Sequence, residues 1–290
     1  MQPKLGLVCM TTTDEVRFRT ITRTSLYKHA EAVRRSVLLE LYRDNARRLG
    51  HGFRFCKRHG IPLFRMSSDL FPFADTPLGM EVLEGMRDEL ARLGAAATGL
   101  RLVMHPDQYV VLSSDTPHVV ENASQALIMH GKVLDLLCQP RTPEAAIIIH
   151  GGKGGRGSQL ARQIDLLPDP VRSRLVLEND ERAYSASEIL GVCKDAGIPM
   201  VFDAHHHIVH KGLDSYDHPS VAAAIRAAAD TWKDPSWQLT HISNGREGFN
   251  DRRHSDFISV MPACYREAPW IEVEAKAKEQ AVARLRDMGW

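Results

Sequence analysis

The chain has 290 residues, of which 43% are hydrophobic and 25% are charged, and its formal net charge is +1. This composition is that of an ordinary globular protein with enough apolar residues to bury a large core. No apolar run reaches the length of a membrane span, and the N-terminal segment lacks the basic and long apolar regions of a signal peptide. We therefore expect a cytoplasmic protein with no membrane partner.

Eight short apolar or β-branched runs, each bounded by turn residues, predict eight strands. They lie at residues 4–9, 61–68, 99–105, 145–152, 174–180, 198–205, 237–243 and 270–276. Most of the intervals carry a helical pattern, and several of these helices end in glycine just before the next strand. Strands that alternate with helices predict a single (β/α)8 barrel of the TIM type over residues 1–290. The pattern is weakest between Gly245 and Pro262, where a polar loop and then a short helix are expected.

A barrel of this kind carries its active site at the C-terminal ends of its strands. The third to the eighth predicted strands each end in, or beside, a residue that commonly binds metal ions. These residues are His105, His150, Glu178, Asp203 with His206, His241 and Glu274. One histidine or glutamate at a strand end is more often structural, but six consecutive strands are hard to attribute to chance. The pattern therefore predicts a metal site at this rim.

The types of residue at this rim narrow the choice of metal. Imidazole and carboxylate groups without cysteine suit divalent manganese, zinc or iron. The rim offers more candidate ligands than one ion can bind. We therefore expect two or three ions that share bridging carboxylates. Clustered ions suit phosphoryl chemistry, in which one activates a water and the others stabilise the charge of the phosphate. His205 and His207 flank His206, and they either support the ligands or pack in the barrel wall.

With these residues assigned, the chain resembles the UV damage endonucleases, DNA repair enzymes whose TIM-type barrel is related in architecture to endonuclease IV. The resemblance covers most of the chain. It lies in FRMSSDLFPFAD (64–75), MHPDQYVVL (104–112), IIHGG (148–152), RLVLENDERAYS (174–185), IPMVFDAHHH (198–207), THISNG (240–245) and VEAKAKEQA (273–281).

The resemblance implies a site of three metal ions, usually manganese, within the two to three divalent ions expected from the number of ligands. The positions that match the family's ligands are His105, His150, Glu178, Asp203, His206, His241, His254 and Glu274. His254 rests mainly on the resemblance, because a surface loop residue is an equally good interpretation of it. Glu178 is the expected bridging ligand, and Glu178, Glu274 and His241 are the expected catalytic residues.

The resemblance also implies how damaged double-stranded DNA is bound. Gln108 and Tyr109 match a Gln-Tyr pair that family members insert into the duplex, where an amide and an aromatic wedge can fill the gap left by extruded bases. Loops after the strands offer further candidate phosphate contacts, although charged loop residues are usually only solvated. These are Lys153, Arg156, Arg246, Arg252 and Arg253.

Two departures from the family pattern concern this site. Some members have a carboxylated lysine two residues before the histidine of the seventh strand, and here that position is Leu239. Such a modification is then absent, or its role is filled otherwise. Members also carry a tyrosine and an asparagine near the first strand that contact the lesion, where this chain offers Leu7 and Thr11. The range of lesions that it accepts is therefore open.

The expected activity is a nick immediately 5′ of a UV photoproduct, which leaves 3′-hydroxyl and 5′-phosphate ends. The expected substrates are cyclobutane dimers and 6-4 photoproducts, with abasic sites as an extension, and the enzyme would associate with the nucleoid during repair without an obligate protein partner. One alternative is a sugar isomerase of the xylose-isomerase type, which leaves Gln108 and Tyr109 unexplained. The other is a non-catalytic damage-binding protein, which would be expected to have lost ligands.

Cysteines and global charge add little to these expectations. The five cysteines are scattered and show no C-x-x-C spacing, so reduced core residues are a better interpretation than disulfides or zinc ligands. They are Cys9, Cys56, Cys138, Cys193 and Cys264. Residues 34–50 and 150–157 could each form a local phosphate-binding patch despite the near-neutral charge. A solvated helix face is the better interpretation of the first of these.

Overall fold

The structure is a computed structural model that describes residues 2–290. Within this part of the chain, eight parallel strands pair in sequence order and close into a barrel, which confirms the predicted fold. The strands are β1 (Lys4–Val8), β2 (Leu63–Met66), β3 (Arg101–Met104), β4 (Ile147–His150), β5 (Leu175–Glu178), β6 (Met200–Asp203), β7 (Leu239–Ile242) and β8 (Trp270–Val273). They are shorter than predicted, because the first residues of six predicted runs precede the ladder and the last residues of each run lie beyond it, in the rim.

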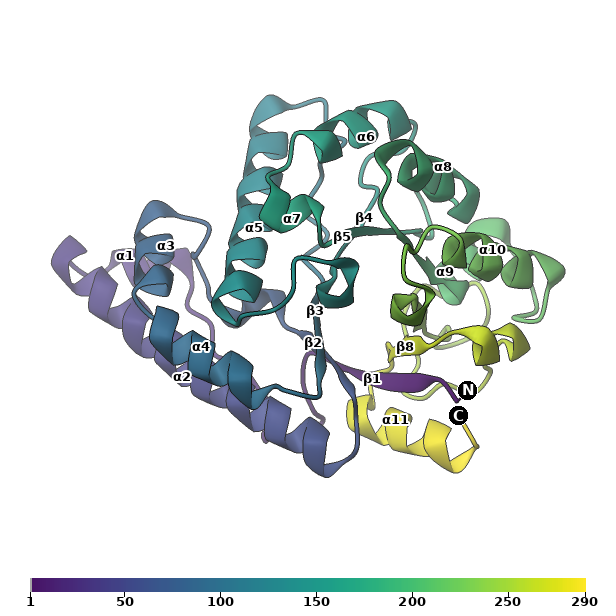
Figure 1. Cartoon of the computed structure of the whole chain (residues 1–290), viewed down its shortest axis with the longest axis horizontal. Helices are drawn as coiled ribbons and strands as arrows, with labels where there is room; N and C mark the ends of the chain where they lie inside the picture. Colours follow the sequence, from purple (N-terminus) through teal and green to yellow (C-terminus); the bar gives the residue numbers. More distant parts are fainter. Residues whose placement is uncertain (1) are drawn as a thin grey trace.

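Helices surround the barrel, and the two described chain ends lie close together beside β1 (Figure 1). The helices are α1 (Arg23–Tyr27), α2 (Glu31–Arg58), α3 (Pro77–Glu84), α4 (Arg87–Ala96), α5 (Pro117–Leu136), α6 (Gly157–Asp165), α7 (Asp169–Arg172), α8 (Ala186–Ala196), α9 (Ala204–Lys211), α10 (Pro219–Ala229) and α11 (Lys278–Asp287). Short 3-10 turns are η1 (Ser68–Leu70), η2 (Pro143–Ala145), η3 (Pro235–Trp237) and η4 (Ala263–Glu267). No described helix is both long and apolar enough to cross a membrane.

The helix ends follow local sequence signals. Ser185 begins α8 with a reciprocal capping box, in which its side chain and that of Glu188 satisfy each other's backbone N–H groups. Gly197 ends the same helix at φ +65°, a left-handed conformation that favours glycine. These two signals fix the length of α8 and hence the point at which β6 enters the barrel.

Alternation along the strands decides which side chains reach the site. Leu63, Val103, Val176, Val201 and Leu239 come from five different strands and form one buried cluster, so they meet inside the barrel. Residues two positions further along a strand lie on the same face. This inner cluster therefore forms the floor beneath the side chains at the C-terminal rim.

Two expectations are wrong in detail. Only Cys56 and Cys193 are buried, while Cys138 is exposed and Cys9 and Cys264 are half-buried; all five are free thiols. The interval from Gly245 to Pro262 holds no helix, and the nearest helical segment is η4 directly after it. In that interval the chain instead makes a β-bridge between Gly245 and His254, which folds the loop back on itself.

Candidate metal centre

Glu178 lies at the centre of the rim, with its side chain only 1% exposed at the end of β5. Its Oε2 lies 2.9 Å from His105 Nε2, and its Oε1 lies 3.0 Å from His241 Nδ1. His206 Nδ1 and His150 Nε2 are further out, at 3.4 and 3.8 Å from the carboxylate oxygens. One carboxylate thus faces four imidazoles that come from four other positions around the barrel.

Three overlapping groups have ligand-type atoms that all lie within 4.8 Å of one another. They are His105, Glu178 and His241; His150, Glu178 and His206; and His241, Glu272 and Glu274. Glu178 belongs to two groups and His241 also belongs to two. An arrangement with shared members can hold neighbouring ions through common ligands.

Asp203 and His206 are placed by the junction of β6 and α9. Asp203 is the N-cap of α9, and its Oδ1 accepts a hydrogen bond from the backbone N–H of His206. Asn179 holds the same junction from β5, because it exchanges two 3.0 Å hydrogen bonds with the backbone of Asp203. The backbone oxygen of Asn179 also lies 2.9 Å from His206 Nδ1. Sequence neighbours of Glu178 therefore orient the next pair of candidate ligands.

His254 reaches the cluster from the loop between β7 and β8. Its Nδ1 lies 3.8 Å from Glu274 Oε2, and the bridge to Gly245 holds its backbone in place. The two histidines that flank His206 differ from it. His205 Nδ1 lies 2.7 Å from the Tyr216 hydroxyl and His207 Nε2 lies 2.9 Å from Ser220 Oγ, so both are engaged with the surrounding structure.

Several buried polar atoms of this donor set are unsatisfied, as expected of a site for divalent ions. Glu178 Oε1, Asp203 Oδ2, Glu272 Oε1 and both ring nitrogens of His241 are buried, and none makes a well-aligned hydrogen bond among the described residues, although Glu178 Oε1 and His241 Nδ1 lie 3.0 Å apart. Burying such groups without partners is costly, and native structures rarely leave them so. Because these oxygen and nitrogen atoms belong to one cluster, divalent cations that accept both kinds of ligand fit the site.

Charges within the cluster shift its pKa values in opposite directions. Burial opposes the ionisation of Glu178, but the facing His241 and His150 hold the pKa of its carboxyl well below its ordinary range. Burial lowers the pKa of His206, yet the carboxylates of Asp203, Glu178 and Glu274 outweigh it and raise this pKa to about 9. Burial lowers the pKa of His150 to about 4. The histidines of this site therefore differ in pKa, and His206 holds a proton more tightly than His150.

Arg65 and Glu272 are part of the cluster and were missed by the sequence reasoning. Glu272 is fully buried on β8, and its Oε2 lies 2.6 Å from His241 Nε2. Arg65, on β2, reaches both Glu272 and Glu274 through its Nη1. The signal was strand parity: Glu272 stands two residues before Glu274, and so it lies on the same face of its strand.

The candidate lesion-binding residues lie on the loop after β3. Gln108 is exposed, and the Tyr109 side chain is 79% exposed, the most of any large hydrophobic residue described. A hollow of about 230 Å³ beside Gln108 is also lined by His150 and Glu181. The Gln-Tyr pair therefore lies at the edge of the metal cluster.

The candidate phosphate contacts are of two kinds. Lys153 and Arg156 both pair with Asp115, and Arg253 pairs with Glu247 and Asp251. Arg246 and Arg252 are exposed and form no ion pair within residues 2–290. The last two are free to meet a phosphate without breaking an existing ion pair.

Leu7 and Thr11 do not face the site, which corrects their expected alignment with lesion-contacting residues. Leu7 is fully buried in the large core cluster that joins the strands to the helices. Thr11 is 1% exposed, and its hydroxyl is used within its own turn, where it accepts from the Val16 N–H. Leu239 packs in the inner cluster below His241, so it supplies no acid to the rim.

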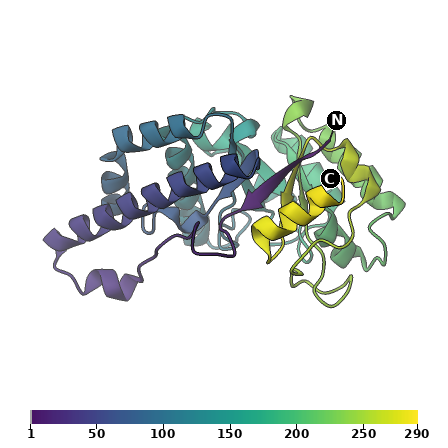
Figure 2. The same ribbon diagram turned by 90° about the horizontal axis from the view of Figure 1, so that it is seen from below.

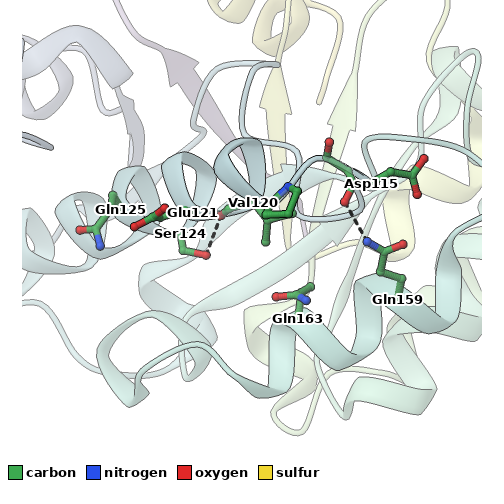
Figure 3. Close-up of a pocket in the computed structure, with 9 residues that line it drawn as sticks. Asp115, Val120, Glu121, Ser124, Gln125, Gln159 and Gln163 are labelled. Carbon is green, nitrogen blue, oxygen red and sulfur yellow. Dashed lines mark hydrogen bonds between the residues drawn. The ribbon is translucent and has the colours of Figure 1, made fainter.

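A larger hollow, of about 470 Å³, lies between the start of α5 and α6, away from this cluster (Figure 3). It is lined mainly by short polar side chains, and Gln159 uses its amide to bond the Ser114 backbone oxygen at 2.8 Å. Its carboxylate at Asp115 is already paired with Lys153 and Arg156. Its lining brings together no cluster of ligand-type atoms, and it does not compete with the rim as a reactive site.

Comparison with known proteins gives a consistent result. Residues 3–289 match the family model described as UV-endonuclease UvdE. The chain is 53% identical over 289 residues to a UV DNA damage endonuclease of Nostoc sp., covering 98% of this chain and 90% of that protein. It is 49% identical to the UV DNA damage endonuclease of Deinococcus radiodurans, covering 99% and 95%. The crystal structure of SacUVDE matches with a TM-score of 0.82 and 25% identity over 99% of both chains.

Proposed function

The chain belongs to the UV-endonuclease UvdE family, and from this premise we propose that it is a metal-dependent repair enzyme that nicks damaged DNA immediately 5′ of a UV photoproduct. The products are a 3′-hydroxyl and a 5′-phosphate. An endonuclease is a phosphodiester hydrolase, which sets aside both the sugar isomerase and the non-catalytic binding protein. The proposed substrates are cyclobutane dimers, 6-4 photoproducts and abasic sites in double-stranded DNA. We propose that residues 1–290 act as one domain, in the cytoplasm and on the nucleoid.

One observation carries the metal dependence: the buried Glu178 carboxylate faces four histidines, and its Oε1 makes no well-aligned hydrogen bond although His241 Nδ1 lies 3.0 Å away. We assign two to three divalent ions, with Mn²⁺ as the first choice and Zn²⁺ as the second, to three groups of ligands. The first is His150, Glu178 and His206; the second is His105, Glu178 and His241; the third is His241 with Glu274. Asp203 and His254 are proposed as further ligands beside these groups. When bound, such ions supply positive charge to the scissile phosphate and activate a water for attack.

The side chains of the rim have three tasks in this proposal. Glu178 joins two groups of ligands and keeps them close together, and Asp203 holds His206 in place through its backbone N–H. His241 and Glu274 form the third group, and they bring its ligand atoms to where negative charge develops during hydrolysis. The apolar inner cluster below excludes water from the floor of the site. Correct positioning by these buried groups accounts for much of the rate that such a site can provide.

Recognition of damage is assigned to the loop after β3. A photoproduct stacks and pairs poorly, so extruding it costs less than extruding an intact dinucleotide. The exposed Tyr109 ring and the Gln108 amide can occupy the space that is vacated. Arg246 and Arg252 are proposed to contact phosphates directly, whereas Lys153, Arg156 and Arg253 must first exchange their carboxylate partners for the DNA.

The decisive test uses supercoiled plasmid, irradiated or intact, incubated with the enzyme in the presence of Mn²⁺ or a chelator. We expect nicked circles only from irradiated plasmid with Mn²⁺, and primer extension should place the break on the 5′ side of the lesion. Equal nicking of both plasmids would contradict damage specificity. Undiminished nicking in chelator, after measured removal of metal, would contradict metal dependence. An aldose–ketose assay of the same preparation checks the isomerase alternative.

A further inference from the structure

The neighbouring strands β7 and β8 place a second carboxylate behind a candidate ligand. Their register sets His241 directly opposite Glu272. His241 Nε2 lies 2.6 Å from Glu272 Oε2, close but not aligned as a hydrogen bond in this structure, while Nδ1 lies 3.0 Å from Glu178 Oε1 and 3.3 Å from Glu274 Oε1. One edge of the ring therefore faces the cluster, and the opposite edge faces Glu272.

Arg65 determines what Glu272 can do. Its Nη1 lies 3.1 Å from Glu272 Oε2 and also bonds Glu274, and the side chains of all three residues are at most 10% exposed. A metal ion bound on the Glu272 side would lie beside this guanidinium, and like charges in a buried site repel strongly. The Arg65–Glu272 pair is therefore better suited to hold the histidine than to bind an ion itself.

We propose that Glu272, held by Arg65, is a positioning residue that accepts the Nε2–H of His241 and so leaves Nδ1 as the metal-binding atom. A carboxylate behind a ligating histidine fixes its tautomer and ring orientation and raises its basicity. This inference rests on the proposed metal centre. It also assigns a role to a charged pair deep in the barrel that is otherwise unexplained.

The first experiment measures metal retention, which does not depend on nicking. Mn²⁺-loaded wild type and Glu272→Gln are dialysed against graded chelator, and the bound metal is counted. We expect Glu272→Gln to bind the same number of ions but to release metal at chelator concentrations about tenfold lower or more. Arg65→Lys, which keeps a cation, should show a smaller shift in the same direction.

Asp135→Asn is the matched control, because it removes a carboxylate from the buried guanidinium of Arg174 away from the candidate ligands. It should lower the unfolding temperature without changing metal retention. If Glu272→Gln behaves like this control, the positioning role is wrong. If Glu272→Gln instead loses a whole ion per molecule, Glu272 is a ligand and the proposal is overturned.

The second experiment observes the ring itself. In Zn²⁺-loaded protein labelled with ¹⁵N-histidine, the two His241 nitrogens are distinguished by their chemical shifts. We expect a protonated Nε2 and a metal-bound Nδ1. A metal-bound Nε2 would overturn the proposal, even if plasmid nicking behaves as proposed, so the two ideas fail separately.

Basic side chains are concentrated in one segment near the N-terminus. The segment of residues 17–35 has six basic side chains and one carboxylate, although the whole chain has a net charge of only +1. It follows β1, and Figure 2 shows α1 and the first turns of α2 reaching past the barrel on the side to which the β1 arrow points. That side is the rim that carries the candidate metal centre. We call residues 17–35 the basic arm.

Three cations of the basic arm have no carboxylate partner in residues 2–290: Arg23, Lys28 and Arg34. Arg34 and Arg23 lie 4.3 and 5.8 Å from the centroid of the Tyr27 ring, which is itself 53% exposed. Stacking on the ring holds these guanidinium groups without neutralising them. The charges remain available to an anion.

We infer that the basic arm binds the phosphate backbone of the duplex at a distance from the lesion. It extends the DNA contact beyond the barrel, so its effect depends on the length of the DNA. This inference rests on DNA as the substrate, but not on the metals or on the wedge. Phosphate contacts of this kind add affinity and salt dependence without sequence preference.

The test compares a triple variant, Arg23→Gln, Lys28→Gln and Arg34→Gln, with a control that carries Lys57→Gln, Lys194→Gln and Lys233→Gln. The control residues are exposed and precede strands, so they lie at the opposite end of the barrel. On a lesion duplex of about 40 base pairs, the slope of log affinity against log salt should fall by about two to three in the arm variant only. On about 12 base pairs, roughly one helical turn, both variants should match wild type.

Equal slopes for the arm variant and wild type on the long duplex would overturn the role of the basic arm. So would an equal loss on both duplexes, because the contact would then lie within the barrel mouth. If wild type nicks neither duplex, the proposed function is wrong, and the slopes of affinity against salt still test the role of the basic arm. Circular dichroism of each variant establishes that the fold is retained.

Discussion

Asp203 Oδ1 accepts a 2.7 Å hydrogen bond from the backbone N–H of His206, so one carboxylate both begins α9 and places the next candidate ligand. Its other oxygen, Oδ2, is buried without a partner among the described residues. The two oxygens therefore have separate roles, one in the helix cap and one in the cluster. Substitutions that remove one role and keep the other can separate them.

Asp203→Asn keeps a good N-cap but removes the negative charge. We expect its metal-free form to unfold near the wild-type denaturant midpoint, while bound metal and nicking both fall by tenfold or more. Asp203→Ala should lose a further ~1 kcal/mol of stability with the cap. Ser185→Ala, which removes the cap of α8, is the control that should reduce stability alone. Unchanged metal content in Asp203→Asn would remove Asp203 from the site.

Glu178→Gln tests the centre of the cluster. It neutralises the carboxylate that faces four histidines, and the lost stabilisation of the transition state should cost at least ~3 kcal/mol, or about a hundredfold in rate. Glu267→Gln, which breaks an exposed ion pair with Arg226, should nick at the wild-type rate. A folded Glu178→Gln enzyme with near wild-type kcat would contradict the assignment.

The pH dependence should have opposite signs with and without metal. Facing carboxylates overcome burial and raise the pKa of His206 from 6.5 to about 9 in the metal-free protein. The proton on His206 therefore stabilises that form fully below pH 6.5, and this contribution is lost as the pH rises towards 9. Metal ions must displace the same proton, so metal affinity should rise over this window. Competition titrations with a calibrated chelator at several pH values would show it, and a flat affinity would contradict it.

Alternate residues of a strand lie on the same face, and this alternation predicts much of the site. The residues that the sequence analysis missed are those to which the alternation was not extended. His150, Glu178 and Asp203 end their strands, so both fold and position could be predicted from apolar runs with polar ends. Glu272 shares the face of Glu274, yet no nearby residue in the sequence marks it, because its partner, Arg65, lies more than two hundred positions away along the chain. Leu7 fails in the opposite way: β1 pairs Gly6 with the inward-facing Leu63, so Leu7 faces the helices.

The sequence pattern alone could not predict whether the Gln108 and Tyr109 side chains are exposed, or whether the basic loop residues are free of ion pairs. The Tyr109 ring is exposed at the rim, and nothing in a sequence distinguishes it from a buried tyrosine in a polar turn. Lys153 and Arg156 looked free in the sequence, but Asp115 neutralises both across a long separation in the chain. Long-range ion pairs of this kind are a property of the folded loops.

Replacing both Gln108 and Tyr109 with alanine should weaken the binding and nicking of lesion DNA together by ~1–3 kcal/mol, the usual range for one lost aromatic stack. Bound metal should not change, because neither residue is in the ligand groups. Tyr109→Phe keeps the ring and should stay close to wild type. Binding to intact duplex is the internal control, since it needs no wedge. An unimpaired double variant would place recognition elsewhere.

We expect the enzyme to accept several kinds of lesion, because Leu7 and Thr11 are buried. Neither side chain can offer a hydrogen bond to a photoproduct, so discrimination by base edges at the first strand is absent. Recognition then depends on how easily the damaged dinucleotide leaves the stack, which cyclobutane dimers, 6-4 photoproducts and abasic sites all make easier. We expect nicking rates on oligonucleotides with one defined lesion to differ by less than about tenfold, or about 1.4 kcal/mol. A strong preference for one photoproduct, retained in the Gln108 and Tyr109 double variant, would show that another group reads the bases.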